Sequence, residues 1–371
     1  MVGLSKFLCA GAFLLLLTSL CPRQCFAQAQ TGNSSCDTSA KQQADQPQQS
    51  KDQIRAKVNE VVVPVTATDA TGELVFDLTQ NDFHIFDHGV EQKIDHWDLG
   101  GDPLAVALLI ETSSRVRAIA PAIHSMSSIF TETVMAFSGE AAVITYDSGV
   151  EVHQTFTQDH YLVGEAIADV RFQVPARKLY DGMAKAVELL EAQPPTYRRI
   201  LLVIGESQDE KSTAKLGVVV REAAEANISI YAVGLSSIGA DLRGNGNGDA
   251  PLNLPGLPPM AAKPCVDFAG NPCFDFMSPA MWILERGADV IKNHHLEVAA
   301  AATGGIHYHG FHDNTIRDAL DRIGAEIHGQ YIISYAPSPD PRAGFNEIKV
   351  TVSRPNVTVR TRPGYFGSPI Q

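Results

Sequence analysis

LAVALLIETSS, residues 104–114, decides the fold, because it joins an unbroken apolar run to a cluster of hydroxyl and carboxylate side chains. A continuous apolar run of this length is typical of a strand that is buried on both faces of a parallel sheet. We therefore predict a central strand of an α/β domain, with residues 111–114 at its carboxyl end. Open α/β sheets bind their ligands at that end of the strands.

Strands and helices alternate after this stretch. The apolar patterns predict a helix over 119–137, a strand pair over 141–146 and 150–156, a helix over 179–190, a strand over 200–204, a helix over 213–226 and a strand over 228–233. Farther on they predict one helix over 281–302, a strand over 306–308 and a helix over 316–327. Such alternation indicates a mostly parallel sheet with helices on both faces.

The two ends of the folded region have β patterns instead. Val61, Val63 and Val65 alternate with other residues, residues 69–72 form a turn and 74–76 resume a strand, which predicts a β-hairpin, with further strands over 83–86 and 93–97. Three more strands are predicted over 331–335, 348–352 and 357–361. We expect residues 55–99 and 330–367 to form a β-sandwich, into which the α/β domain of residues 100–329 is inserted. That domain carries a long Gly- and Pro-rich loop over 237–279.

The first residues predict export. Lys6 precedes an apolar run over 10–20, and small residues follow at Ala27 and Ala29, which is the pattern of a signal peptide over 1–29. The run is too short and interrupted for a spanning helix, and no other segment reaches that length. Residues 30–54 are polar and predict a disordered tether. We expect a periplasmic or extracellular protein without a stable membrane span after cleavage.

Charge and cysteine content narrow the function further. Cleavage removes Lys6 and Arg23 and no acid, so the formal charge falls from −13 to −15, and nucleic acid is an improbable partner. Cys265 and Cys273 lie close together in the long loop, which outside the cytosol predicts a disulfide rather than a zinc site. Cys36, in the tether, is expected to be free or to pair between molecules.

Four stretches taken together resemble one family. They are residues 61–86 with LTQNDFHIFD, LAVALLIETSS at 104–114, KLYDGMAKAVELL at 178–190, and QYIISYAP through VRTRPGY at the C-terminal end. In their order and spacing they are similar to von Willebrand factor A-type domains, and in particular to the related domain of exported acidobacterial proteins. The resemblance implies a Rossmann-like A domain inserted in a β-sandwich, and a role in binding rather than catalysis.

The resemblance also implies a divalent cation at the end of the first strand, held by Asp-x-Ser-x-Ser, a Thr and an Asp. Here the first motif aligns with Glu111, Thr112, Ser113, Ser114 and Arg115, while the Thr position falls on Arg177 and the later Asp position on Glu206. A longer carboxylate suits the tight geometry of Mg²⁺ poorly, and a guanidinium adds permanent positive charge where the ion would sit.

Two hypotheses follow for this site. In the first, Arg115 and Arg177 pair with Glu111 and Glu206, replace the cation and hold the loops together. In the second, these side chains are solvated remnants of a decayed site. We expect no cofactor. Retention of Mg²⁺ by Glu111, Ser113 and Glu206, with help from Ser114 or Asp209, is the less favoured alternative.

The expected binding surface is the rim made by Glu111, Ser113, Ser114, Arg115, Arg177, Glu206 and Asp209 together with the long loop, and its expected partner is a protein or peptide. No catalytic residue is predicted, since Ser113 and Ser114 lack the glycines of a nucleophile turn. One alternative is a metal-dependent hydrolase that uses His294, His295, His307, His309 and His312 with Asp313. Another is a structural protein that assembles through its sheet edges or Cys36. The sequence does not determine the oligomeric state.

Overall fold

The computed structural model of the 371-residue chain describes residues 60–101, 103–235, 277–286, 294–310, 313–338 and 341–367. Outside the described residues lie the predicted signal peptide, the predicted tether, most of the predicted loop over 237–279, and the three cysteines Cys36, Cys265 and Cys273. None of the described helices is both long and apolar enough to cross a membrane.

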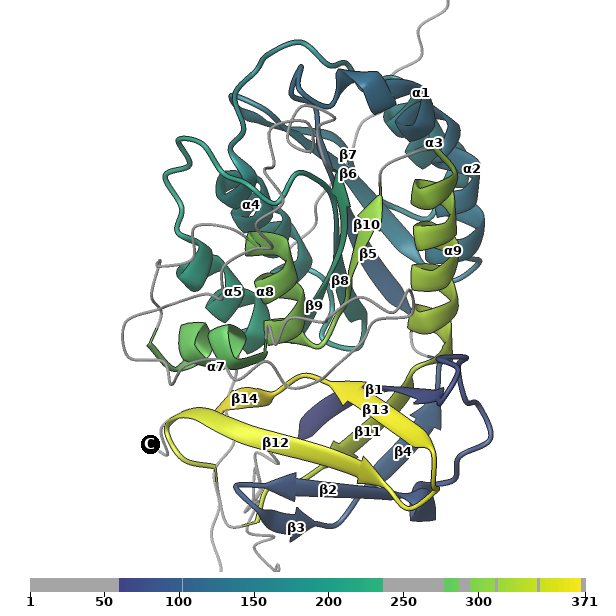
Figure 1. Cartoon of the computed structure of the whole chain (residues 1–371), viewed down its shortest axis with the longest axis vertical. Helices are drawn as coiled ribbons and strands as arrows, with labels where there is room; N and C mark the ends of the chain where they lie inside the picture. The colour runs from purple at the N-terminus through teal and green to yellow at the C-terminus, as the bar shows by residue number, and fades with distance from the viewer. Residues whose placement is uncertain are drawn as a thin grey trace, which may run out of the picture. The chain divides into compact units, whose positions relative to one another are not determined.

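A mixed sheet forms the centre of the larger domain (Figure 1). Its strand order is β10-β9-β8-β5-β6-β7, with bounds Leu104–Glu111 for β5, Glu140–Tyr146 for β6, Val150–Thr157 for β7, Arg198–Gly205 for β8, Ile228–Leu235 for β9 and His307–Gly310 for β10. All neighbours are parallel except β6 and β7, which form an antiparallel hairpin. Every residue of β5 is buried, as expected of a central strand.

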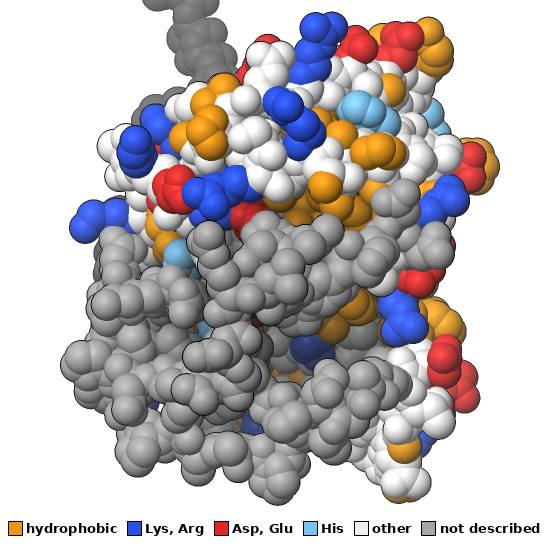
Figure 2. Space-filling model, turned by 45° about the horizontal axis from the view of Figure 1, so that its top comes forward, with side chains coloured by type: hydrophobic (Ala, Val, Ile, Leu, Met, Phe, Trp, Pro, Cys, Tyr) orange, Lys and Arg blue, Asp and Glu red, His pale blue; other side chains and the backbone are white. Residues whose placement is uncertain are grey.

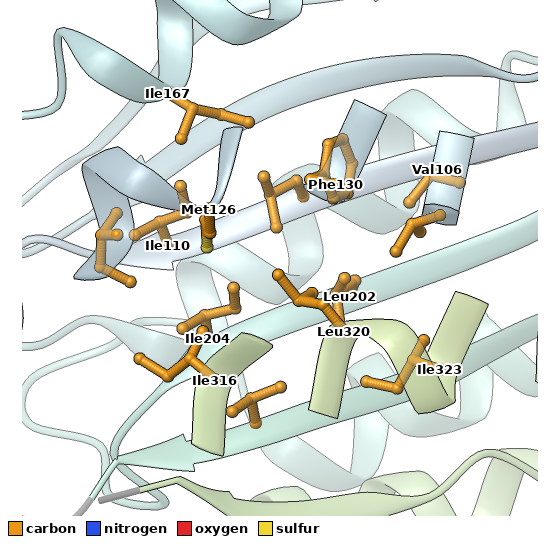
Figure 3. Close-up of a cluster of buried hydrophobic side chains, with 14 of the residues drawn as sticks. Val106, Ile110, Met126, Phe130, Ile167, Leu202, Ile204, Ile316, Leu320 and Ile323 are labelled. Atoms are coloured by element: carbon orange, nitrogen blue, oxygen red, sulfur yellow. The ribbon is translucent and has the colours of Figure 1, made fainter. Parts of the chain in front are cut away.

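Helices cover both faces of this sheet, so each face has its own apolar core. On one face lie α4 (Leu179–Glu191), α5 (Leu216–Glu225), α7 (Met277–Arg286) and α8 (His295–Thr303); on the other lie α1 (Ala120–Ser125), α2 (Ser127–Ile129), α3 (His160–Ala168) and α9 (Asp313–Gly329). Figure 3 shows the second core, where Val106 of β5 and Leu202 of β8 lie near Phe130 and Leu320. The predicted mostly parallel sheet with helices on both faces is confirmed.

Three helix predictions need correction. The helix predicted over 119–137 is a series of short turns, η2 (Arg117–Ile119), α1, α2 and the π-helix η3 (Phe130–Met135), which ends where Ala136 has a φ of 50°. The helix predicted over 281–302 is two separate helices, α7 and α8. Helix α3 was not predicted, although Asp159 caps it by accepting hydrogen bonds from the backbone N–H groups of Tyr161 and Leu162.

The two ends of the folded region build a β-sandwich. One sheet has the order β13-β1-β11-β4 and the other β14-β12-β2-β3. The bounds are Val61–Asp69 for β1, Phe83–Asp87 for β2, Val90–Gln92 for β3, His96–Leu99 for β4, Tyr331–Tyr335 for β11, Gly344–Val352 for β12, Val357–Thr361 for β13 and Gly364–Gly367 for β14. N-terminal and C-terminal strands pair within each sheet, so the predicted sandwich with an inserted α/β domain is confirmed.

Two local predictions in the sandwich are wrong. Residues 74–76 do not form the second arm of a hairpin, because β1 pairs with β11 and β13 and only an isolated bridge joins Thr68 to Leu74. The strand predicted over 93–97 is instead β4, which begins at His96, and the separate short strand β3 precedes it. Pairing with strands that are remote in sequence overrides the local pattern in both places.

A buried polar network joins the sandwich to the larger domain. Arg360 of β13 pairs with Glu326 of α9 at 2.5 Å and donates a hydrogen bond of 2.6 Å to the carbonyl oxygen of Gly304. The second carboxylate oxygen of Glu326 accepts a 2.7 Å hydrogen bond from the hydroxyl of Tyr231, to which Gln330 donates at 3.0 Å. Because the contacts come from both domains, they fix the sandwich at the end of the sheet where β8 begins.

Candidate functional site

The candidate site lies at the carboxyl ends of β5 and β8, where three loops meet. The first loop follows β5 at Glu111, the second precedes α4 and contains Arg177, and the third follows β8. Backbone hydrogen bonds connect them: the N–H of Ser114 donates to the carbonyl of Val174 at 2.8 Å, and the N–H of Glu210 donates to the carbonyl of Arg177 at 2.7 Å. The loops therefore form one backbone unit before any side chain is considered.

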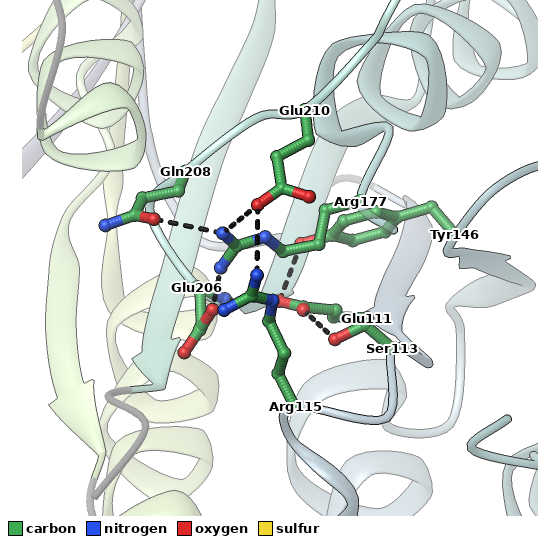
Figure 4. A network of polar contacts seen from close by, with 8 residues as sticks. All are labelled: Glu111, Ser113, Arg115, Tyr146, Arg177, Glu206, Gln208 and Glu210. Carbon is green, nitrogen blue, oxygen red and sulfur yellow. Dashed lines mark hydrogen bonds and ion pairs between the residues drawn. The ribbon is translucent and has the colours of Figure 1, made fainter. Parts of the chain in front are cut away.

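Arg177 is the centre of the side-chain network (Figure 4). Its guanidinium, 3% exposed, forms an ion pair with Glu206 through Nη1. Its Nη2 donates to Oε1 of Glu210 at 2.8 Å and to Oε1 of Gln208 at 3.0 Å. The hydrogen bond from Arg177 lowers the pKa of Glu210. One guanidinium thus holds three side chains of the loop after β8.

The structure brings Arg177 and Glu206 together but distributes the other charges differently from the predicted pairing. Arg115 lies 3.4 Å from Glu210, not against Glu111, and both partners of this second pair are partly exposed. Among the described residues no arginine forms an ion pair with Glu111. Glu210 therefore supplies the second negative charge of the network, which sequence reasoning missed although it lies only four residues after Glu206.

Glu111 is fully buried and has a set of hydrogen bonds of its own. Its Oε1 accepts a 2.5 Å hydrogen bond from the hydroxyl of Ser113, and its Oε2 accepts a 2.6 Å hydrogen bond from the backbone N–H of Glu206. The hydroxyl of Tyr146 lies 3.5 Å from the same Oε2. Burial raises the pKa of Glu111 to about 7, against the opposing effects of the Ser113 hydroxyl and the nearby Arg177 charge. This carboxyl group joins the first and third loops.

These residues do not fit a divalent cation of the kind that the family resemblance implies. The guanidinium of Arg177 lies against the carboxylate of Glu206, so a positive group already neutralises that ligand. The hydroxyl proton of Ser113 points to Glu111, and both carboxylate oxygens of Glu111 already accept hydrogen bonds. An ion that requires about six oxygen ligands in near-octahedral geometry has no such set here.

The two remaining predicted rim residues have structural contacts of their own. Asp209 does not turn toward Glu206; its carboxylate accepts hydrogen bonds from the hydroxyl of Ser212 at 2.5 Å and from the backbone N–H of Tyr180 at 3.2 Å. Ser114 contributes its backbone N–H to the loop contact and has a partly buried side chain. Figure 2 shows basic and acidic side chains next to one another on the described part of this upper face.

Within the part of the chain that the structure describes, the late histidines form no metal-ligand cluster, although His294 and His307 both lie close enough to Glu297 to lower its pKa. His294 contacts Glu297 at 3.1 Å, whereas His295 contacts the hydroxyl of Tyr180 at 2.9 Å. His307 lies in β10 beside Gly234. No group of three potential metal ligands occurs among the described residues. The side chains of His309 and Asp313, and the whole of His312, lie outside the described set.

Comparisons with known proteins found no matching family model and no matching curated protein. Solved structures with a similar fold include the conserved hypothetical protein BatB from Bacteroides thetaiotaomicron, at 12% identity over 60% of this chain and 98% of that chain with a TM-score of 0.38. They also include the SpRpn10 VWA domain, at 15% identity over 38% and 78% with a TM-score of 0.30. A third is a von Willebrand factor type A protein from Catenulispora acidiphila, at 10% identity over 78% and 76% with a TM-score of 0.41.

The architecture of the chain itself agrees with the family resemblance found in its sequence. A mostly parallel sheet with the fully buried strand β5 near its centre is covered by helices on both faces and is inserted in a sandwich built from both ends of the folded region. The chain has the fold of a von Willebrand factor A-related domain.

Proposed function

We propose that this chain is an exported protein-binding module that recognises a protein or peptide through the rim formed by residues 111–117, 176–181 and 205–210 and the loop over 237–279. The observation that carries this proposal is the Arg177 network, which joins the loop before α4 to the loop after β8. The Arg115–Glu210 pair and the backbone hydrogen bond from Ser114 to Val174 add the loop after β5 to the same arrangement. Fixed loops lose little conformational entropy when a partner binds.

The chemistry of the rim supports recognition by shape and charge. Arg115 and Glu210 are partly exposed, with side-chain exposures of 47% and 37%, and both extend from the buried network. Gln208 is also exposed, and its side-chain oxygen accepts a hydrogen bond from the buried guanidinium of Arg177. A surface with fixed donors and acceptors of both charges suits the polar contacts of a protein interface.

The same geometry argues against nucleophilic catalysis at this position. The hydroxyl of Ser113 is buried, and it donates its hydrogen bond to a carboxylate rather than to a histidine. An activated serine requires an adjacent base and access for the substrate. Ser113 therefore serves better as a support for Glu111 than as a nucleophile.

Site-specific photo-crosslinking in the producing cell tests the proposal. A crosslinkable residue at Ala118, an exposed position beside the rim, should capture one discrete partner, whereas the same residue at Val218, exposed on α5, should not. Arg115→Glu places like charges beside Glu210 and should abolish the crosslink, while the melting temperature changes little because the pair is exposed. Equal capture from Ala118 and Val218, or full capture with Arg115→Glu, would count against rim recognition.

Two further measurements test whether a divalent cation binds and whether the long loop contributes to partner binding. Millimolar Mg²⁺ or Mn²⁺ should leave the melting temperature unchanged, since an ion that bound the folded state would stabilise it by an amount that rises with the logarithm of its concentration. Deletion of residues 240–276 should remove partner capture without unfolding the domain. Cation-dependent stabilisation that a chelator reverses would contradict the replacement of the cation by arginine side chains. Unchanged partner capture by the deletion variant would show that the loop is not part of the binding surface.

A further inference from the structure

A cavity of about 300 Å³ lies between the sandwich and the larger domain, at the end of the central sheet where β8 and β9 begin. Strands β1 and β11 contribute apolar side chains such as Val62, Pro64 and Ile332. The amino ends of β8 and β9 contribute Ile200 and Ile228. Its volume is at the lower end of the range for sites that bind small organic molecules.

Arg362, which follows β13, lines this cavity with an unusual lack of counter-charge. The residue is 7% exposed, and its one hydrogen bond among the described residues runs from Nη1 to the side-chain oxygen of Asn227. Its Nε is buried and has no hydrogen-bond partner. Burial lowers the pKa of Arg362 to about 10, although the neighbouring Tyr335 and Tyr365 oppose the effect. The side chain is still charged at neutral pH.

A second guanidinium at the cavity has the same deficiency. Arg199 donates from Nη1 and Nη2 to the backbone carbonyls of Ala226 and Gln193, and its buried Nε has no partner. Glu60 is the one acidic residue among the described residues that line the cavity, and it is exposed and accepts a hydrogen bond from Ser334. The cavity wall therefore carries more positive charge than negative.

Two other arginines of this chain show the counter-charge that Arg362 lacks. The buried Arg177, whose Nε also has no hydrogen-bond partner, is paired with the carboxylates of Glu206 and Glu210. The partly exposed Arg360 is paired with Glu326. A guanidinium that is removed from water without an anion costs several kcal/mol. The pattern in the rest of the molecule therefore identifies a carboxylate as the group that would complete the Arg362 site.

We propose that the cavity between the two domains binds a small organic acid, with its carboxylate against Arg362 and Arg199 and its apolar body against the aliphatic side chains of β1, β8, β9 and β11. The planar guanidinium offers paired N–H donors that match a carboxylate. The apolar lining would favour an acid with a short aliphatic chain over a small polar anion. This site is independent of the rim and of the partner proposed for it.

Isothermal titration calorimetry of the purified chain with octanoate, and with octanol as the uncharged counterpart, tests the site. Octanoate should bind at one site per chain and raise the melting temperature, and octanol should bind at least tenfold more weakly. Arg362→Met should weaken octanoate binding about ten- to a hundredfold, the range expected for hydrogen bonds to a charged group. Arg354→Met is the matched control, since Arg354 pairs with Asp77 on the sandwich away from the cavity.

Val62→Trp provides a second test that keeps both arginines. Val62 is 39% exposed, so a larger side chain can occupy the cavity without entering a core, and it should block octanoate even if Arg362→Met fails to fold. A tetrapeptide that ends in leucine, with a free or an amidated C terminus, distinguishes a chain end from a free acid as the source of the carboxylate. Equal binding of octanoate and octanol, no binding of any carboxylate, or unchanged octanoate binding by Val62→Trp would overturn the proposal.

Discussion

Glu111→Gln should change how stability depends on pH. The carboxyl group of Glu111 is fully buried, and burial raises its pKa from the ordinary value of 4.5 to about 7. Glutamine has nearly the same shape, can accept the hydrogen bond from the N–H of Glu206 and can donate to the hydroxyl of Ser113, which now donates to Glu111. The substitution therefore removes the titration while the hydrogen-bonded positions remain filled.

The sign follows from the direction of the pKa shift. The folded state binds the proton of Glu111 more tightly than the unfolded chain does, so its stabilising effect is complete below pH 4.5 and is lost as the pH rises toward 7. A shift from 4.5 to about 7 corresponds to about 3 kcal/mol, since one pKa unit is worth about 1.4 kcal/mol. Relative to the wild type, Glu111→Gln should gain up to about 3 kcal/mol in unfolding free energy between pH 4.5 and pH 8.

Urea denaturation of both proteins at pH 5, 6, 7 and 8 measures this difference directly. Subtraction of the two curves cancels the titration of other groups, such as His328, whose pKa is lowered by burial. Any constant effect of the amide shifts the difference at all pH values equally and leaves its slope unchanged. A difference that stays flat from pH 5 to pH 8, or that falls with rising pH, would refute the assignment of a raised pKa to Glu111.

Three other substitutions follow from buried charges. Arg177→Met should destabilise the chain by about 3–5 kcal/mol in urea denaturation at pH 7, because it removes the guanidinium that pairs with the buried carboxylate of Glu206; a loss below about 1 kcal/mol would mean that the network is solvated. Glu297→Gln should lower the unfolding free energy by up to about 3 kcal/mol at pH 7 and by nothing near pH 2. Although burial opposes ionisation, hydrogen bonds hold the pKa of Glu297 at about 2, so the stabilisation is present above pH 4.5 and is lost as the pH falls. Equal losses at pH 7 and pH 3 would contradict this. Arg360→Met should lower the unfolding free energy by about 3–5 kcal/mol, because Glu326 is left unpaired at the domain junction, and a melting temperature equal to that of the wild type would show that the junction does not need the pair.

The sequence predicted the fold where burial determines the pattern. The unbroken apolar run of β5 could be assigned because all eight of its positions are buried, and the helices α4, α5 and α9 could be assigned because each has one apolar face. The predicted long helices over 119–137 and 281–302 were wrong because apolar content continues through points where the backbone turns, as at Ala136. Apolar periodicity reports which residues face a core and is less informative about where a helix is interrupted.

The candidate site was predicted in composition but not in pairing. The alignment of Arg177 and Glu206 with metal-ligand positions follows from residue order alone, and the structure brings these two side chains together. The contributions of Gln208 and Glu210 depend on how the loop after β8 turns back to Arg177, which residue order does not specify. Glu111 was predicted to form an ion pair with an arginine because the number of opposite charges matched, although residue order does not say where each side chain lies. In the structure its contacts are the hydroxyl of Ser113 and the backbone N–H of Glu206.

The proposed exchange of a metal ion for a guanidinium would have a physical consequence for recognition. A bound divalent cation can leave, and it offers a free coordination position to a carboxylate of the partner, so binding through it depends on cation concentration. The guanidinium of Arg177 is attached to the chain and already uses its Nη groups on Glu206, Gln208 and Glu210, so little of its charge remains available for a partner. Under the proposed function, recognition at this rim would come from the exposed groups next to Arg177, chiefly Arg115 and Glu210, and from the shape of the three loops. The buried arginine would keep the surface in one arrangement without a metal ion, and the exposed residues around it would give that surface its specificity.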